Sequence, residues 1–92
     1  MIPVRVSPTA YRDLARLADF LDLKNPRAAH AAADAMLDGI QSLGAFPERG
    51  RPLRSNLREL AVVYGRDGYV IRYRLGATEV FVIRIFHARE RR

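Results

Sequence analysis

The sequence predicts an α+β domain in which a short N-terminal strand and an αα-hairpin precede a three-stranded antiparallel meander. Two observations lead to this prediction. Apolar residues recur at helical spacing through most of the first half, and after residue 57 the period changes from 3.6 to 2, with β-branched and aromatic residues enriched. Because 92 residues without a visible linker are enough for one small core, residues 1–92 should form a single domain.

A strand and a helix are expected first. Residues 2–6 alternate as a short strand, and Pro3 stands near its start, where a missing N–H is tolerated. Ser7 supplies an N-cap and Pro8 a first helical position, so a helix should run to residue 23. Its apolar stripe is wider than one packing face requires, which makes it either a candidate partner surface or a surface for a second helix.

The second helix repeats the same start signal. Asn25 and Pro26 follow the first helix almost directly, so the two helices should form a tight hairpin. The second helix should extend to about Leu43, and Gly44 should adopt the left-handed C-cap conformation. Its inner residues are mostly alanine and glycine, which permit close helix approach.

Three strands should follow at residues 57–63, 69–75 and 79–86, joined by turns that contain glycine. In the middle strand, one face should carry Tyr69 and Tyr73 into the core, because alternate residues point to opposite sides. In the last strand, the residues expected on one face are Phe81, Ile83 and Ile85, opposed by Val80, Val82, Arg84 and Phe86. The face away from the hairpin should be partly hydrated and positive, with Arg72, Arg74 and Arg84 along it.

Positive charge is concentrated in the second half of the chain. Residues 1–46 hold five basic and five acidic side chains, whereas residues 47–92 hold eleven arginines and five acids, so the net charge of +6 lies entirely in the second half. Fifteen arginines against one lysine fit either a compositional bias or a need for bidentate contacts. The connector FPERGRPLRSNLREL needs an acidic partner outside itself, because Glu48 and Glu59 do not balance its arginines. These arginines are Arg49, Arg51, Arg54 and Arg58.

Several classes of site are not expected. The chain has no cysteine, which removes disulfides and thiolate metal sites and fits a reducing compartment. It shows no metal-ligand cluster, phosphate-binding glycine loop or nucleophile–base motif, so no cofactor or metal is expected. It has no apolar run of signal-peptide or membrane-spanning length, so we expect a cytoplasmic protein with no membrane partner.

The chain resembles the RelE/ParE superfamily of type II toxin–antitoxin toxins over almost its whole length. The resemblance rests on the order of elements and on short blocks: FPERGR and LREL in the connector, YVIRYRL in the middle strand of the meander, and VFVIRIFHARE at the end. It implies the RelE/ParE-like fold. It also implies one of two activities, because RelE-like members cut messenger RNA on the ribosome and ParE-like members poison DNA gyrase.

The residues favour the ParE-like branch. Ribonuclease members resemble one another in an arginine at the position of Val70, a tyrosine near or after the last strand, and lysines in the connector. Here no tyrosine follows Tyr73, and the only lysine is Lys24. Arg89 alone matches a basic position that the ribonucleases use. The expected function is therefore gyrase inhibition by binding, without catalytic residues.

Two alternatives remain open. The first is an mRNA endoribonuclease that uses Arg89, His87 and Arg58, and the second is a non-toxic, basic nucleic-acid-binding module of the same fold. RNA cleavage requires an acid, a base and cations around one phosphate. Glu59 and His87 are conceivable as the acid–base pair, but His87, like His30, is interpreted as a structural residue.

The resemblance also implies partners. The antitoxin is expected to be ParD-like, to bind through a partly acidic C-terminal segment, to form a hetero-oligomer with the toxin and to provide its only link to operator DNA. Its candidate contacts are Tyr11, Leu14, Ala15, Ala18, Phe20, Arg51, Arg54 and Arg58. Candidate contacts with the target are Arg49, Arg51, Arg54, Arg58, Arg72, Arg74, Arg84, Arg89, Arg91 and Arg92.

Overall fold

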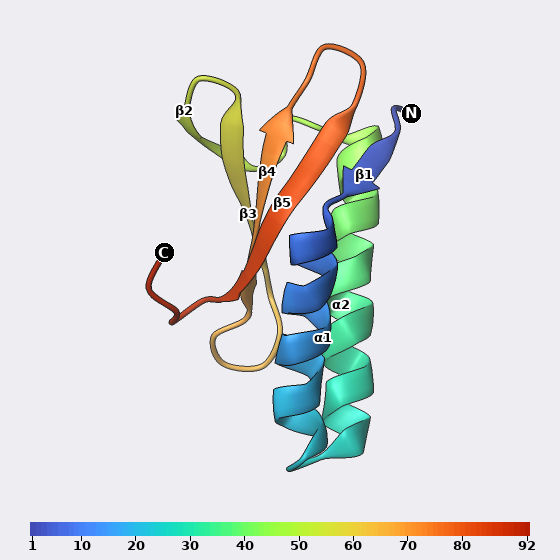
Figure 1. Ribbon diagram of the computed structural model, residues 1–92, viewed down its shortest axis with the longest axis vertical. Coiled ribbons are helices and arrows are strands. Elements are labelled where there is room, and N and C mark those ends of the chain that lie inside the picture. Colours follow the sequence, from blue (N-terminus) through green and yellow to red (C-terminus); the bar gives the residue numbers. More distant parts are fainter.

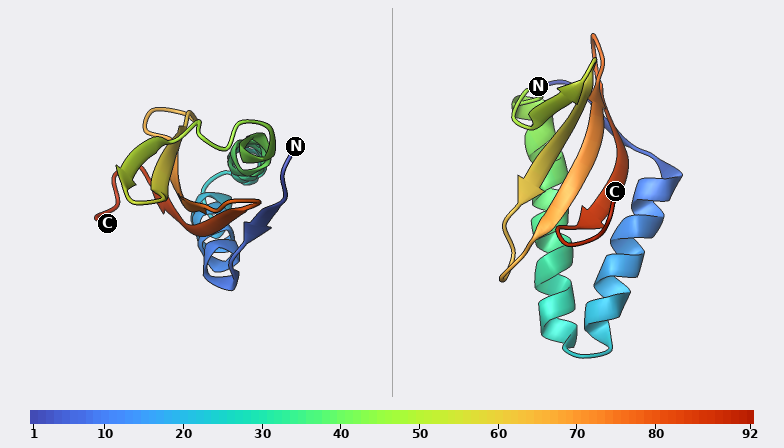
Figure 2. Two further views of the ribbon diagram at one scale, coloured as in Figure 1. Left: turned by 90° about the horizontal axis from the view of Figure 1, so that it is seen from above. Right: turned by 90° about the vertical axis from the view of Figure 1, so that its left-hand side faces the viewer.

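The computed structural model describes all 92 residues and confirms the α+β class (Figure 1). Its sheet has the strand order β1-β5-β4-β3-β2, in which β1 runs parallel to β5 and all other neighbours are antiparallel. The helical hairpin lies on one side of the sheet, so the opposite face is open (Figure 2). The elements are β1 Val4–Val6, α1 Pro8–Asp22, α2 Pro26–Ala45, β2 Arg51–Arg54, β3 Leu57–Val62, β4 Tyr69–Leu75 and β5 Val80–His87.

The two helix starts are those that the sequence predicts. The side chain of Ser7 accepts a hydrogen bond from the backbone N–H of Ala10 at 3.0 Å, and Asn25 accepts from Ala28 at 3.1 Å. Each cap satisfies one backbone donor that the first helical turn leaves free. The end of α2 differs from the prediction: Gly44 is not a left-handed cap but lies inside the helix, which ends at Ala45. Its carbonyl accepts from Ile2 at 3.0 Å, so it helps hold the N-terminal segment against α2.

Close packing of α2 on the sheet explains its small residues. A Cβ atom added to Gly39 would lie 2.8 Å from Val62 Cγ2 and 3.0 Å from Ile71 Cδ1, so only glycine permits this approach. The core between hairpin and sheet includes Met36 and Tyr73, both fully buried. This is the adequate but small core expected for a chain of this length.

The sheet has one strand that the sequence prediction missed. Residues 51–54 of the arginine-rich connector form β2, which pairs with β3 at the edge of the sheet. Pro52 is tolerated there because an edge strand leaves one row of N–H groups unpaired. The connector therefore belongs partly to the sheet, and its arginines are fixed in register with those of the other strands.

The side-chain alternation predicted for the last strand does not hold across Ile83: Arg84 and Ile85 lie on the faces expected for them, but Val80 and Val82 lie in the core instead of on the open face with Arg84. Arg72 pairs with Arg84 while the next residue, Tyr73, pairs with Val82, so Ile83 is an extra residue in β5. Such a β-bulge reverses the alternation of everything after it. Val80, Val82 and Ile85 consequently all point into the core, although they were expected on opposite faces.

Candidate functional site

The open face of the sheet carries one continuous row of charged residues. The strand registers place Arg84 of β5 opposite Arg72 of β4, Arg72 opposite Glu59 of β3, and Glu59 opposite Arg51 of β2. Four strands thus each contribute one charged side chain to the same line. We call the four residues Arg84, Arg72, Glu59 and Arg51 the charged row.

Glu59 is the centre of this row and is only 5% exposed. Its carboxylate accepts from Arg72 at 2.8 and 3.0 Å and from Arg51 at 3.4 Å. Arg92 of the C-terminal tail folds over the open face and donates to it at 3.2 and 3.4 Å. Burial alone would raise the pKa of Glu59, but the hydrogen bonds from Arg92 and Arg72 outweigh it and hold the pKa below its ordinary value. Glu59 therefore remains a carboxylate that shares three guanidinium groups.

Arg92 separates two hollows on the open face. One has a volume of about 380 Å³ and is lined by Arg49, Arg51 and Glu59 among others. The other has a volume of about 420 Å³ and lies between Arg54 and Arg72. Both hollows have Arg92 in their walls, so the position of the tail determines how much of the basic surface a partner can reach.

The next row of the open face is apolar. Ala61, Val70 and Phe86 face one another across β3, β4 and β5. The guanidinium groups of Arg84 and Arg72 lie 4.8 and 5.1 Å from the centre of the Phe86 ring, in cation–π contact. Val70 and Phe86 are both buried. This row has no side chain that could transfer a proton or bind a phosphate.

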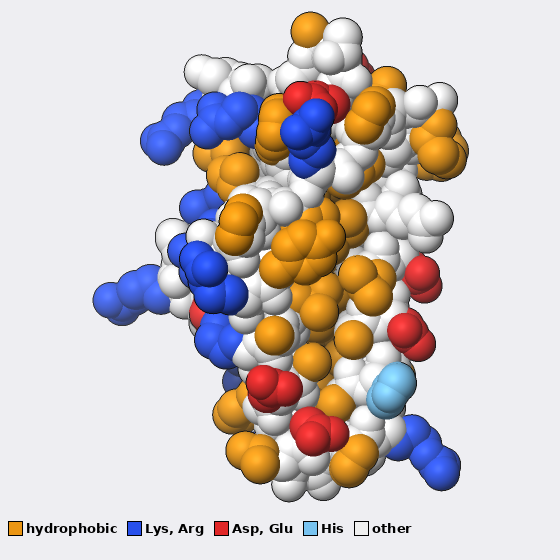
Figure 3. All heavy atoms as spheres, turned by 45° about the vertical axis from the view of Figure 1, so that its right-hand side comes forward, with side chains coloured by type: hydrophobic (Ala, Val, Ile, Leu, Met, Phe, Trp, Pro, Cys, Tyr) orange, Lys and Arg blue, Asp and Glu red, His pale blue; other side chains and the backbone are white.

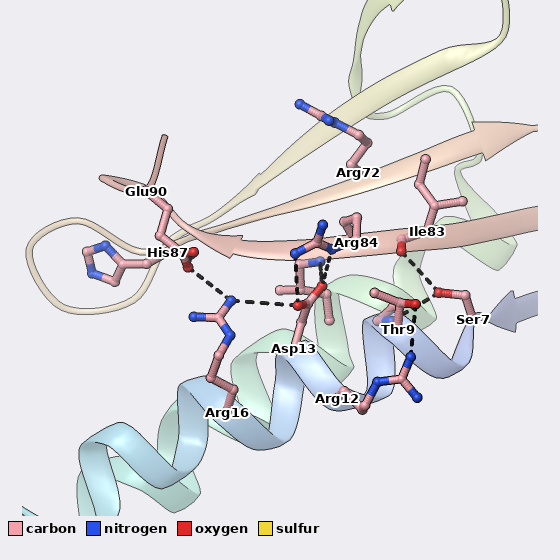
Figure 4. Close-up of polar contacts among 12 residues, drawn as sticks. Ser7, Thr9, Arg12, Asp13, Arg16, Arg72, Ile83, Arg84, His87 and Glu90 are labelled. Carbon is pink, nitrogen blue, oxygen red and sulfur yellow. Dashed lines mark hydrogen bonds and ion pairs between the residues drawn. The ribbon is translucent and has the colours of Figure 1, made fainter. Parts of the chain in front are cut away.

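A second buried carboxylate joins α1 to β5. Asp13 accepts from Arg84 at 2.8 and 3.2 Å and from the backbone N–H of Ile85 at 2.9 Å (Figure 4). Burial would raise the pKa of Asp13, but the hydrogen bonds from Arg84 and Ile85 hold it below its ordinary value. Arg84 therefore lies in the charged row but is already paired with α1.

The same network reaches the C-terminal tail. Arg16 lies between two acids, 3.6 Å from Asp13 and 3.2 Å from Glu90 (Figure 4). Glu90 in turn accepts from the backbone N–H of His87 at 2.8 Å. Asp13, Arg16 and Glu90 were not proposed as site residues from the sequence, because isolated charges on a helix and in a tail give no signal of a shared network.

The remaining connector arginines have unequal roles. Arg58 is half-buried and donates to the carbonyls of Glu48 and Gly50 at 2.9 and 2.8 Å, so it holds the loop before β2. Arg49 donates to Ser42 at 2.7 Å. Tyr73 supports the same loop, because its hydroxyl donates to Pro47 and accepts from Gly50.

The other arginines named as target contacts lie at the margin of the open face or on the tail. Arg74 donates to Asn56 at 3.2 Å, and Arg89 pairs with Asp67 at 3.2 Å. Arg54 and Arg91 are exposed and form no ion pair. The fold brings Arg51, Arg72 and Arg92 together, but it does not gather all ten candidates into one site.

The three residues of the ribonuclease alternative do not all converge: the backbone N–H of Arg89 donates to His87 Nδ1 at 3.1 Å, but Arg58 lies apart from both. His87 lies opposite Tyr69, and Arg58 lies opposite Tyr73, four residues further along β4. Four residues of a strand span about 13 Å. His87 also packs edge-on against the ring of the buried Tyr69, on the helix side, whereas Glu59 lies on the open face. His87 and Glu59 therefore form no acid–base pair.

The antitoxin candidates fall on two separate surfaces. Tyr11 and Phe20 of α1 are 59% and 62% exposed. Hydrophobic side chains form a stripe along the helical hairpin, with acidic side chains beside it (Figure 3). Arg51 and Arg54 lie on β2, at the opposite edge of the sheet from β1. Ala15 is exposed, whereas Leu14 and Ala18 are partly buried, and Leu14 packs against the core.

A hollow of about 620 Å³ adjoins Phe20, between α1 and the end of β5, with Leu17, Tyr69 and His87 in its walls.

No helix is both long and apolar enough to cross a membrane.

Comparison with known proteins identifies the family. Residues 4–92 match the model described as the ParE toxin of the type II toxin–antitoxin system parDE. The chain belongs to the ParE toxin family. It is therefore a toxin-type member of the RelE/ParE superfamily, as the sequence blocks indicated.

The relatives and solved structures similar to this chain carry both RelE and ParE names. Toxin RelE3 of Caulobacter vibrioides is 39% identical over the whole of both chains, and Toxin RelE1 of the same organism is 40% identical over 97% of this chain and 96% of its own. The chromosomal ParDE system of P. aeruginosa matches with a TM-score of 0.79 at 22% identity, covering 95% and 96% of the two chains. The RelBE2 toxin–antitoxin complex of Mycobacterium tuberculosis matches with a TM-score of 0.63 at 27% identity, covering 94% and 96%.

Proposed function

We propose that this ParE-family toxin arrests growth by binding DNA gyrase and stabilising its cleaved DNA complex, without chemistry of its own. A cognate antitoxin would neutralise it by covering the surfaces through which it binds. The toxin would act in the cytoplasm, where gyrase meets the chromosome. No cofactor or metal enters the proposal.

The composition of the open face is the observation that supports a binding role. RNA cleavage needs a base for the 2′-hydroxyl, an acid for the leaving oxygen and free cations for the phosphorane. The only carboxylate in the charged row, Glu59, is held ionised by three arginines, and Arg84 is paired with Asp13. His87 points to the other side of the sheet, and Val70 stands in an apolar row. This arrangement suits recognition better than acid–base catalysis.

The antitoxin proposal rests on the charge and shape of the surface. The chain carries a net charge of +6, so an acidic segment would be attracted to it at long range. The exposed Tyr11 and Phe20 offer apolar anchors on α1, whereas Arg51 and Arg54 lie on β2 across the sheet. A partner that uses both surfaces must be extended enough to cross the molecule.

Pulse labelling of DNA and protein synthesis immediately after induction of the toxin alone tests the proposal. DNA synthesis should fall first and an SOS response should follow, and co-expression of the antitoxin should prevent both. An early fall in protein synthesis with continued DNA synthesis would contradict the gyrase proposal.

One observation favours a second candidate, a ribosome-dependent mRNA endoribonuclease. Both relatives with almost full coverage carry the name RelE. Arg89 would be the first residue to substitute, because it alone matches a ribonuclease position and is exposed on the tail. If the gyrase proposal holds, the unsubstituted toxin cleaves no RNA, so Arg89→Ala cannot lower transcript cleavage. Loss of transcript cleavage in that variant, compared with the unsubstituted toxin, would favour the ribonuclease.

A further inference from the structure

The Glu59 cluster, Glu59 with Arg51, Arg72 and Arg92, has the composition of an anion-binding site that already contains an anion. Arginine forks bind carboxylates and phosphates in the same way, by charge-assisted N–H···O bonds. Three guanidinium groups from β2, β4 and the C-terminal tail meet on one buried carboxylate, at 2.8 to 3.4 Å. The carboxylate belongs to the chain itself, on β3 between two of its partners.

If Glu59 did not occupy the cluster, its surroundings would suit the phosphodiester backbone of a nucleic acid. Arg49 lines one adjacent hollow and donates to the Ser42 hydroxyl, and Arg54 lines the other hollow and is exposed. Without Glu59 the open face would present four arginines around two hollows, an arrangement favourable to the phosphates of single-stranded nucleic acid; they are Arg51, Arg54, Arg72 and Arg92.

We infer that Glu59 is an internal anion that sets the specificity of the open face, because it occupies the arginine cluster and withholds it from nucleic-acid phosphates. A toxin that must reach a protein target gains from such a residue, since RNA in the cell is abundant and polyanionic. With Glu59 in place, the cluster has a net charge of +2, and several of its arginine N–H donors are already bound to the Glu59 carboxylate. The inference deepens the proposed function, but it concerns nucleic-acid affinity and is tested apart from toxicity.

The test compares Glu59→Gln with Asp34→Asn in binding a fluorescent single-stranded RNA oligonucleotide. Both substitutions change the net charge by +1, but Asp34 lies exposed on α2, on the helix side of the molecule. Each newly available phosphate contact steepens the slope of log K against log[salt] by about 0.7 for single strands. Glu59→Gln should therefore steepen the slope by about 1 to 2 and tighten binding about tenfold or more at low salt. Asp34→Asn should bind almost as the unsubstituted protein does.

The double variant Glu59→Gln/Arg72→Gln separates the cluster from net charge. It has the net charge of the unsubstituted protein, and removing both members of a buried pair costs less stability than removing one. Arg51 and Arg92 are free in it, so it should bind RNA more tightly than the unsubstituted protein and more weakly than Glu59→Gln. If Glu59→Gln does not fold, this variant carries the test alone.

Two results would overturn the inference. One is an equal gain in RNA affinity from Glu59→Gln and Asp34→Asn, which would assign the effect to net charge. The other is a double variant that binds no better than the unsubstituted protein. Because toxicity is not measured in this experiment, failure of the gyrase proposal would leave these outcomes unchanged.

Discussion

The two buried carboxylates of this toxin lie in similar surroundings and are bound in different ways. Asp13, at the junction of α1 and β5, accepts from a backbone N–H of the sheet as well as from Arg84. Glu59, on the open face, accepts only from arginine side chains, one of them on the tail. Asp13 therefore completes the backbone hydrogen bonding of the sheet, whereas Glu59 only modifies the charge of a surface. The first carboxylate should govern stability and the second should govern recognition.

Removal of Asp13 should have the largest effect on stability. Asp13→Ala leaves the N–H of Ile85 without a partner and Arg84 without its acid, because β1 pairs with β5 only up to Val82. The expected loss is about 2 to 4 kcal/mol in the free energy of unfolding, measured by urea denaturation. Asp19→Ala, at an exposed position on the same helix, should cost less than about 0.5 kcal/mol. If Asp13→Ala lost no more stability than Asp19→Ala, Asp13 would not be the carboxylate that governs stability.

Acid should destabilise the fold through both carboxylates. Each has a folded-state pKa below its ordinary value, which is 3.8 for Asp13 and 4.5 for Glu59. Their contribution to stability is therefore complete above these ordinary values, and it is lost as the pH falls through the lower folded-state pKa values. Thermal unfolding should show a falling midpoint below about pH 4.5 and a shallower fall in Asp13→Asn. An unchanged pH profile in that variant would show that Asp13 is not stabilised as a carboxylate.

Substitution of Glu59 should have a smaller effect on stability. In Glu59→Gln no backbone group loses a partner, and Arg51, Arg72 and Arg92 are 68%, 24% and 25% exposed in their side chains, so water can solvate them again. The expected loss is about 1 to 2 kcal/mol in urea denaturation, smaller than that of Asp13→Ala because no backbone donor is left unpaired. A loss as large as that of Asp13→Ala would mean that Glu59 is a structural residue rather than a modifier of the surface.

Removal of the tail contact should have the smallest effect. Arg92→Ala deletes one of the three partners of Glu59 and a hydrogen bond to the Ala88 carbonyl, both in the C-terminal tail, so stability should change by less than about 1 kcal/mol. Hydrogen exchange should nevertheless increase in the tail, because Arg92 holds it over the open face. Arg91→Ala is the matched control, since Arg91 is exposed and forms no ion pair. Equal exchange in the two variants would show that Arg92 does not hold the tail.

Sequence reasoning recovers the fold where local signals determine it. Ser7 and Asn25 define the helix starts, and period-two segments define β3 to β5, since capping and alternation act over a few residues. The bulge at Ile83 was not predictable from alternation, because an extra residue in one strand is visible only against its neighbour. Strand β2 was missed because Pro52 and four nearby arginines indicate a loop.

The candidate site was predicted only in part for the same reason. Alternation placed Arg72 and Arg74 on the open face, and the charge count indicated that the connector needs an acid. The acid that binds Arg51 turned out to be Glu59, within the connector region itself, because strand register places the two side by side. Arg92 binds Glu59, which lies 33 positions earlier in the chain, and Arg84 binds Asp13, which lies 71 positions earlier. Composition carries no information about such long-range contacts.

The most direct test of a binding rather than a catalytic toxin uses purified components. The toxin is added to gyrase with supercoiled DNA and ATP, and in parallel to ribosomes programmed with messenger RNA, with the antitoxin complex as control in both. We predict that cleaved DNA accumulates in the gyrase reaction while the messenger RNA stays intact. Cleavage of the ribosome-bound messenger RNA, with gyrase unaffected, would contradict the account.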